Sequence, residues 1–255
     1  NRNRIIMALN TEKNSYTVIF AVVMVVVVGS LLAFLASSLS GKIKENERFE
    51  KQQNILYAMG INENTPDGGV NFIPTNVVED RFLKEVKGQY VWVNGEVEED
   101  DQAFLIDVKK EFAALKTGGE ARLPIFIGEK DGEELYVLPM YGKGLWDAIW
   151  GFMSVDKDMV VQGVYFDHRG ETAGLGANIK LRFFMDDFIG ESLMEGQSYS
   201  GIAVSKTNND PLNDDKGDNE VDAIAGATIT GNGVSAMIKE TLKLYRPYLE
   251  QIRNN

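Results

Sequence analysis

The longest apolar stretch of the chain lies near its N-terminus. No charged residue occurs from Asn14 to Gly41, and the run Tyr16–Leu39 consists mainly of Val, Leu, Ile, Ala and Phe. About 20 residues of α-helix cross the hydrocarbon core of a bilayer. The pattern therefore predicts a single transmembrane helix over residues 16–39, preceded by a short N-terminal segment, residues 1–15. A cleaved signal peptide is the competing interpretation, but its apolar region would be unusually long.

Beyond this run, helical and strand-like periodicities follow one another. Residues 42–59 have helical spacing before Gly60, which predicts a helical stalk over residues 40–60. Residues 178–190 are amphipathic and are expected to pack on a sheet. The mixture predicts an α+β fold, in which a single N-terminal transmembrane helix precedes one mixed α/β domain over residues 61–255. The expected strands are 89–93, 123–128, 134–138, 151–155, 159–166 and 198–206, and the expected further helices are 77–86, 104–115 and 234–252.

Composition and charge exclude several kinds of site. The sequence contains no cysteine and one histidine, His168, which excludes a thiolate-bound iron–sulfur cluster or a structural Cys/His zinc site within it. The formal net charge is −12 at pH 7, and so acidic a chain repels nucleic acid. We therefore expect no nucleic-acid partner. The polar connection 207–219 contains four Asp residues, but it lacks the glutamate and glycine spacing of an EF-hand loop.

The residues best suited to chemistry occur where the last predicted helix begins. Small residues, Gly226 and Ala227, stand beside two hydroxyl side chains, Thr228 and Thr230. A helix N-terminus offers unpaired N–H groups and the positive end of a dipole to a phosphate, and glycine lets a bulky anion approach the backbone. The residues alone leave two interpretations open, a phosphate site or a helix N-cap at one of the threonines.

Two further stretches combine glycine with side chains suited to ligand binding. In residues 141–146, Gly142 and Gly144 permit close approach of a ring to the backbone, while Leu145 and Trp146 offer apolar or stacking surface. We assign the nearby Trp150 to the core. A turn followed by a core tryptophan is the alternative interpretation of this stretch.

The second stretch, residues 168–176, follows a predicted strand. Glu171 and Thr172 carry polar groups that can bind ligand hydroxyls or phosphate, and the segment Gly174-Leu175-Gly176 permits close backbone approach. Lys206, at the end of a later predicted strand, is placed to offset phosphate charge. A turn after a strand is again the alternative interpretation.

Together these stretches resemble the FMN-binding domain family. Residues 222–228, Asp-Ala-Ile-Ala-Gly-Ala-Thr, are similar to its flavinylation motif Asp-x-x-(Ser/Thr)-Gly-Ala-Thr, with Ala225 in place of the usual Ser or Thr. Residues 142–146 are similar to Gly-x-Gly-Leu-Trp, and residues 171–176 to Glu-Thr-Pro-Gly-Leu-Gly with Ala173 in place of Pro. The resemblance covers nearly the whole chain. Among family members it is greatest to the flavin-carrying subunits of sodium-translocating NADH:quinone reductases, and the Rnf-type complexes are close relatives.

The resemblance implies an electron-transfer subunit of a membrane-bound oxidoreductase, with FMN attached covalently to Thr228 through a phosphoester bond. It implies a flavin transferase and the other subunits of the complex as partners, and no catalytic or metal-binding residue in the chain itself. The expected cofactor-binding residues, taken from the motifs together with Lys206, are Gly142, Gly144, Leu145, Trp146, Glu171, Thr172, Gly174, Leu175, Gly176, Lys206, Asp222, Ala225, Gly226, Ala227, Thr228 and Thr230.

The residues alone do not decide the orientation of the predicted transmembrane helix, and they allow two alternative functions. Three Lys or Arg precede the apolar run and four follow it closely, so charge does not decide its orientation. The resemblance implies that the domain lies outside the bacterial cytoplasmic membrane. A membrane-anchored module that binds another phosphate ligand is one alternative function. A hydrolase with a threonine nucleophile is another, although neither Thr228 nor Thr230 is N-terminal and the histidine is distant in sequence.

Overall fold

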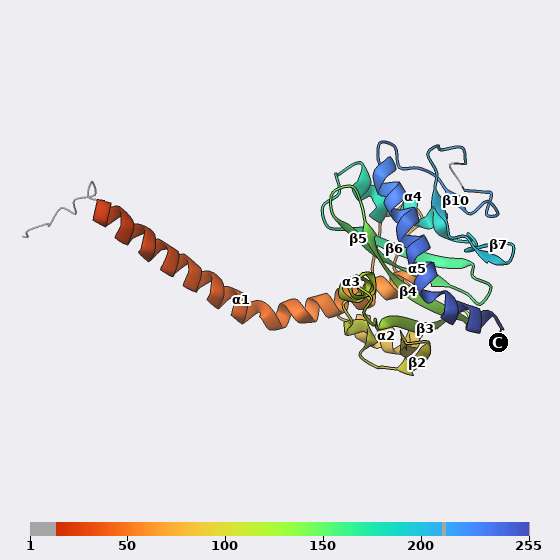
Figure 1. The fold of residues 1–255 in the computed structure, drawn as a ribbon, viewed down its shortest axis with the longest axis horizontal. Coiled ribbons are helices and arrows are strands. Elements are labelled where there is room, and N and C mark those ends of the chain that lie inside the picture. Colours follow the sequence, from red (N-terminus) through yellow and green to blue (C-terminus); the bar gives the residue numbers. More distant parts are fainter. Residues whose placement is uncertain (1–13, 211–212, 255) are drawn as a thin grey trace, which may run out of the picture. The chain divides into compact units, whose positions relative to one another are not determined.

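The computed structural model describes residues 14–210 and 213–254 of the chain. These residues belong to two compact units, the first ending at Glu47 and the second beginning at Arg48. The ribbon of Figure 1 shows the helix of the first unit and the mixed helix and sheet structure of the second.

The first unit is described only by part of the helix α1, Asn14–Ala58. This helix is long and apolar enough to cross a membrane, and its large apolar side chains from Val18 to Leu39 are exposed. The segment 16–39, predicted to span the membrane, lies within it. Most of the predicted N-terminal segment, residues 1–15, lies outside the described residues.

The second unit is built on a six-stranded antiparallel sheet with the strand order β2-β1-β3-β4-β5-β6. Two of its hairpins turn at a residue pair with positive φ, Asn94-Gly95 between β1 and β2 and Asp131-Gly132 between β3 and β4. Asn-Gly and Asp-Gly adopt this backbone region readily, and such turns match the twist of the flanking strands. The strands of the sheet are β1 (Val86–Val93), β2 (Glu96–Glu99), β3 (Leu123–Lys130), β4 (Glu133–Lys143), β5 (Ala148–Val155) and β6 (Val161–His168).

The remaining elements precede, interrupt or follow this sheet. α5, which begins at Thr228, contributes a row of buried apolar side chains at helical spacing. The short strands β9 and β10 pair in parallel, and β7 and β8 pair antiparallel. The elements are α2 (Val78–Glu85), η1 (Ala103–Leu105), α3 (Val108–Lys116), η2 (Gly176–Lys180), α4 (Arg182–Met185), η3 (Asp186–Phe188), β7 (Met194–Glu195), β8 (Ser198–Tyr199), β9 (Ala203–Val204), β10 (Glu220–Val221) and α5 (Thr228–Asn254).

Different parts of the chain cover the two faces of the sheet. α5 lies across one face (Figure 1), where the ring of Tyr136 packs on Tyr248 with 6.4 Å between centroids. Tyr136 pairs with Val155, and the adjacent Ser154 points to the opposite face because successive strand residues alternate. There the Ser154 hydroxyl donates a hydrogen bond to the carbonyl of Ala58, 2.5 Å away. The last turn of α1 is therefore part of the core of the second unit.

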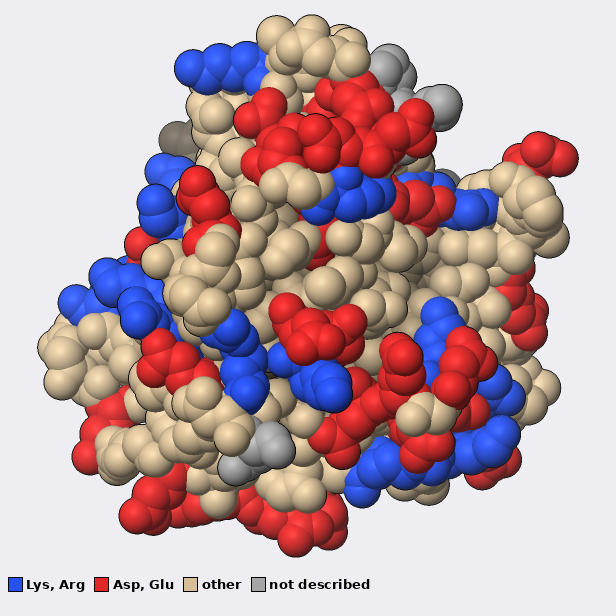
Figure 2. All heavy atoms as spheres, turned by 90° about the vertical axis from the view of Figure 1, so that its right-hand side faces the viewer, with Lys and Arg blue, Asp and Glu red and all other residues tan. Residues whose placement is uncertain are grey.

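Acidic and basic side chains share the surface of this unit. Figure 2 shows several clusters of Asp and Glu with Lys and Arg between them on one face. This distribution agrees with the negative formal charge of the sequence.

The α+β prediction is confirmed, but the predicted strand over residues 198–206 is wrong. The structure contains two short strands there, β8 and β9, separated by Gly201 with φ of 82°. That left-handed backbone conformation cannot continue a strand. After this interruption, β9 does not continue β8 and pairs in parallel with β10.

The amphipathic segment predicted over residues 178–190 consists of three short helical pieces, η2, α4 and η3. Phe184 and Phe188 are buried against Phe166 of β6, with centroids 5.9 and 5.2 Å from its ring. Phe183, by contrast, is exposed. The segment therefore packs on the sheet as expected, but only some of its apolar residues face inward.

Three other details differ from expectation. β2 was not predicted, because all four of its residues are exposed and they do not alternate in polarity. α5 begins at Thr228, earlier than its apolar period, which starts at Val234. Trp150, assigned to the core, is only partly buried on β5. Its strand partners, Tyr141 and Asp167, are likewise only partly buried.

Candidate functional site

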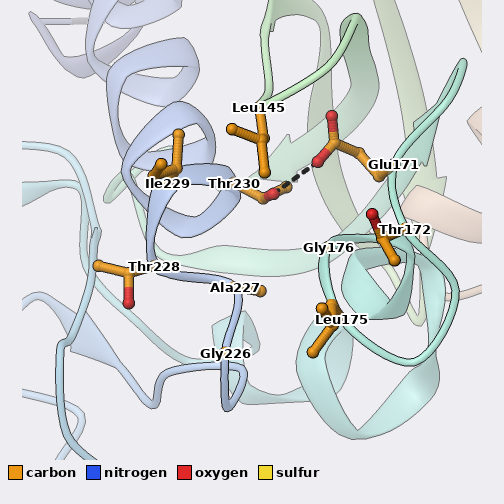
Figure 3. Close-up of a pocket in the computed structure, with 10 residues that line it drawn as sticks. All are labelled: Leu145, Glu171, Thr172, Leu175, Gly176, Gly226, Ala227, Thr228, Ile229 and Thr230. Carbon is orange, nitrogen blue, oxygen red and sulfur yellow. Dashed lines mark hydrogen bonds between the residues drawn. The ribbon is translucent and has the colours of Figure 1, made fainter.

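A pocket opens at the start of α5, where all three of the stretches singled out from the sequence meet (Figure 3). Its cavity volume is about 260 Å³. The β4–β5 connection, the loop after β6 and the residues leading into α5 each contribute to its wall. The lining residues are Leu145, Glu171, Thr172, Leu175, Gly176, Gly226, Ala227, Thr228, Ile229 and Thr230.

The side chain of Glu171 lies at the inner end of this pocket and is only 7% exposed. One carboxylate oxygen accepts a hydrogen bond from the backbone N–H of Trp146 (2.9 Å), and the other accepts one from the hydroxyl of Thr230 (2.6 Å). Burial alone raises the pKa of the Glu171 carboxyl. The hydrogen bonds from Thr230 and from the N–H groups of residues 145–147 outweigh burial and hold this pKa below its usual value.

The two threonines of the last stretch have different environments. Thr230 is 1% exposed, and its hydroxyl donates a hydrogen bond to the carboxylate of Glu171. Thr228 is exposed as the first residue of α5, and in Figure 3 its hydroxyl points away from the Thr230–Glu171 pair. Within the described part of the chain, the Thr228 hydroxyl has no hydrogen-bond partner. Neither threonine therefore acts as the N-cap that the sequence left open.

The backbone at the start of α5 supplies unused donors. The N–H of Gly231 bonds to the carbonyl of Ala227 (2.9 Å), which is the first bond of the helix. The N–H groups of residues 228–230 precede that bond and have no acceptor within the helix. Gly226 has φ of 72°, a left-handed conformation that glycine adopts without cost. Backbone N–H groups without an intrahelical acceptor, close to a glycine that has no side chain, are suited to bind a phosphate group.

Large apolar side chains surround the mouth of the pocket. Trp146 is 68% exposed and Ile229 57% exposed, and Leu145 and Leu175 are also exposed. The indole N–H of Trp146 donates to the hydroxyl of Thr172 (3.1 Å), so one edge of the ring is held while much of it remains open to solvent. Exposed apolar groups gathered at a cavity are typical of a ligand or interaction site.

Several predicted residues do not line the pocket. Gly142 and Gly144 belong to the β4–β5 end of the sheet, and Gly174 is in a turn with φ of 78°. Lys206 follows β9 and is exposed. The others outside the lining are Trp146, Asp222 and Ala225. One carboxylate oxygen of Asp222 is buried without a hydrogen-bond partner among the described residues.

Two residues near the site were not predicted to belong to it. Ile229 lines the pocket, and its only signal in the sequence is an apolar side chain between two threonines at a helix start. The Nδ1 atom of His168 accepts a hydrogen bond from the backbone N–H of Glu171 (3.2 Å). This histidine begins the stretch 168–176 singled out from the sequence, but no binding role was expected of it.

Comparison with known proteins shows matches over the same region. Residues 144–243 match the FMN-binding domain family. The C subunit of the Na(+)-translocating NADH-quinone reductase from Yersinia pestis is 27% identical, over 96% of this chain and 95% of the relative. The crystal structure of the corresponding protein from Parabacteroides distasonis is 33% identical, with a TM-score of 0.69, and the match covers 83% of this chain and 96% of that chain. The crystal structure of Shewanella oneidensis NqrC, 22% identical with a TM-score of 0.64, shows the same fold.

The match to the FMN-binding domain family, the relatives named above and a helix able to cross a membrane identify the chain as an FMN-binding subunit of a membrane oxidoreductase. More specifically, the chain belongs to the NqrC family, the C subunits of Na(+)-translocating NADH-quinone reductases. The resemblance noted from the sequence is confirmed, and the relatives named above are of the sodium-translocating type.

Proposed function

We propose that the chain carries FMN as a phosphoester on Thr228 and relays electrons between the redox subunits of a membrane-bound Na(+)-translocating NADH:quinone oxidoreductase. The contrast between the two threonines is the observation that carries this proposal. Thr228 presents an exposed, unpartnered hydroxyl at the pocket, whereas the Thr230 hydroxyl is buried and bonded to Glu171. Only Thr228 is open to a modifying enzyme.

The residues of the pocket fit both ends of FMN. The free N–H groups of the first turn of α5 are placed for the phosphate, and Gly226 and Ala227 leave room for it. The exposed side chains of Leu145, Trp146 and Ile229 offer apolar surface to the planar ring. Bound FMN supplies the redox chemistry, which no side chain of the pocket provides. The domain's own part is to hold and orient the cofactor.

We also propose the topology and partners that the sequence suggested. Residues 1–15 are cytoplasmic, and residues 16–39 cross the bacterial inner membrane. Residues 40–60 connect this span to the domain, with their C-terminal part packed in its core, and residues 61–255 form the rest of the extracytoplasmic FMN-binding domain. A flavin transferase is needed because a threonine hydroxyl is a poor nucleophile without activation. The neighbouring subunits of the complex donate and accept the electrons.

Mass spectrometry of the full chain, expressed with a flavin transferase, tests the cofactor assignment. We expect a proteolytic peptide containing residues 222–230 to carry the added mass of FMN less one water, with fragment ions that place it on Thr228. Purified protein should show the visible absorbance of a flavin. A colourless protein with an unmodified peptide would favour the alternative of a binding module without redox function.

Cysteine labelling tests the topology, because the sequence has no native cysteine. Asn208→Cys lies at an exposed position and should react with an impermeant thiol reagent in cells whose outer membrane is permeabilised and whose cytoplasmic membrane is intact. Asn10→Cys, in the predicted cytoplasmic segment, is the matched control and should react only after lysis. The reverse pattern would place the domain in the cytoplasm.

The hydrolase alternative gains no support from the geometry. His168 accepts a hydrogen bond from the backbone of Glu171. Within the described structure, no hydrogen bond joins it to Thr228 or Thr230. A threonine nucleophile would need such a base within hydrogen-bond distance.

A further inference from the structure

The carboxylate of Glu171 is surrounded by protein donors on both oxygens. It receives the N–H of Trp146 on one oxygen and the hydroxyl of Thr230 on the other. Its own backbone N–H bonds to His168 at the end of β6. A buried carboxylate whose oxygens are already hydrogen-bonded has little capacity left for a ligand. It would also repel the phosphate of a bound nucleotide.

Two of the motif glycines lie directly against this carboxylate. A Cβ atom added at Gly144 would stand 2.5 Å from one oxygen of Glu171, and a Cβ atom added at Gly176 would stand 2.6 Å from the other. Both distances are far below van der Waals contact. The absence of side chains is thus required at Gly144 by the Glu171 carboxylate, and at Gly176 by that carboxylate together with the Thr230 hydroxyl that donates to it.

A second pair of glycines brings α5 close to the end of β4. A Cβ atom at Gly142 would stand 2.7 Å from the Cβ atom of Met237, and one at Gly233 would stand 2.5 Å from the carbonyl oxygen of Lys143. The first three turns of α5 therefore lie almost in backbone contact with the end of β4. This close approach lets one carboxylate reach both segments.

We infer that Glu171 is a positioning residue for the cofactor site. Its carboxylate joins the first turn of α5 to the turn at residues 144–147, and so fixes where the Thr228 hydroxyl stands relative to the apolar side chains Leu145 and Trp146. Glu171, Thr230 and the N–H of Trp146 are called the Glu171 cluster below. The inference rests on the proposed attachment at Thr228, but the cluster itself can be measured without flavin.

Four variants of the full chain separate positioning from ligand contact. Glu171→Ala removes both acceptors, and Thr230→Val removes one donor at nearly constant shape. Glu171→Gln keeps an acceptor for Trp146 and an amide that can donate to the Thr230 oxygen, but it removes the charge. Val161→Ala shortens a fully buried side chain at the far end of β6 and is the control for general loss of stability.

The first measurement is amide hydrogen exchange of protein produced without the transferase. We expect Glu171→Ala and Thr230→Val to speed exchange at least about tenfold in both residues 142–148 and residues 231–234, since a buried partner is lost. Glu171→Gln should retain most of the protection, and Val161→Ala should leave these two segments no faster than the rest of the domain. Unchanged exchange in both segments of Glu171→Ala and Thr230→Val would overturn the inference.

The second measurement uses protein produced with the transferase and follows flavin yield and the fluorescence anisotropy of the attached flavin. Both should fall in Glu171→Ala and recover in Glu171→Gln. A Gln variant that keeps its exchange protection yet loses flavin as completely as Ala would overturn the inference, because the charge would then act on the ligand directly. If Glu171→Ala does not fold, Thr230→Val and Glu171→Gln carry both measurements. A wild-type chain without covalent flavin would refute attachment at Thr228, while the exchange result would still decide whether the cluster joins the two segments.

Discussion

Thr228→Val should yield a full-length, folded protein that carries no covalent flavin. Valine has nearly the shape of threonine but no hydroxyl, so it removes the acceptor of the phosphoester bond with little change in packing at an exposed position. α5 should persist, because its stability comes from the buried side chains further along, such as Tyr245 and Leu249. In-gel flavin fluorescence after denaturing electrophoresis measures the loss, which we expect to be complete.

Two hydroxyl-retaining variants serve as matched controls. Thr228→Ser keeps an oxygen at the same position and should retain part of the fluorescence. Thr230→Ser keeps the hydrogen bond to Glu171 and should stay close to wild type. Fluorescence that survives in Thr228→Val, or a modification found on Thr230, would contradict the assignment. Loss of α5 by circular dichroism in Thr228→Val would show instead that the change had disturbed the fold.

The parts of the fold that the sequence predicted well depend on local signals. The helix α1 follows from an uncharged apolar run, and the β3–β4 hairpin follows from Asp131-Gly132 between two apolar segments. Each signal lies within a few residues of the structure it specifies. No knowledge of distant contacts was needed.

The parts that were missed depend on pairings and backbone turns that the pattern of apolar residues does not reveal. β2 has no apolar pattern and exists because it pairs with β1 across the Asn94-Gly95 turn. The apolar residues around Gly201 predict one strand, but the backbone turns there so that β9 meets β10, far along the chain. The early start of α5 was missed as well, because residues 228–233 lie before the apolar helical period that begins at Val234.

The candidate site shows the same division. The sequence singled out three stretches, and the structure brings them together at one pocket. The sequence did not reveal what joins these three stretches, because the hydrogen bond between Glu171 and Thr230 connects residues that are 59 positions apart. The glycines at 144 and 176 were interpreted as space for a ligand because glycine in a motif has no partner visible in the sequence. In the structure, a Cβ atom added at Gly144 would lie nearest to the Glu171 carboxylate. One added at Gly176 would lie nearest to the hydroxyl of Thr230, which donates to that carboxylate.

Phe166→Ala should cause a large loss of stability in the second unit. Phe166 is fully buried, and its ring lies 5.9 Å from Phe184 and 5.2 Å from Phe188, which are themselves 5.3 Å apart. Removing one ring from such a core costs about 3–5 kcal/mol through lost burial and the cavity that remains. For a domain of this size, each kcal/mol lowers the thermal midpoint by roughly 2–4 °C. We expect a decrease of roughly 6–20 °C, measured by near-ultraviolet circular dichroism of the purified chain.

Phe183→Ala is the control, because it removes the same kind of ring from the adjoining α4 segment at a position that is 56% exposed. A surface substitution of this kind changes the free energy of unfolding by no more than about 0.5 kcal/mol. The two variants should therefore differ by most of the effect of Phe166→Ala. If they lower the thermal midpoint equally, the three-ring cluster does not anchor the segment after Gly176 to the sheet. The loop that carries Glu171 and Thr172 would then be held chiefly by its hydrogen bonds, including those to Trp146 and Thr230.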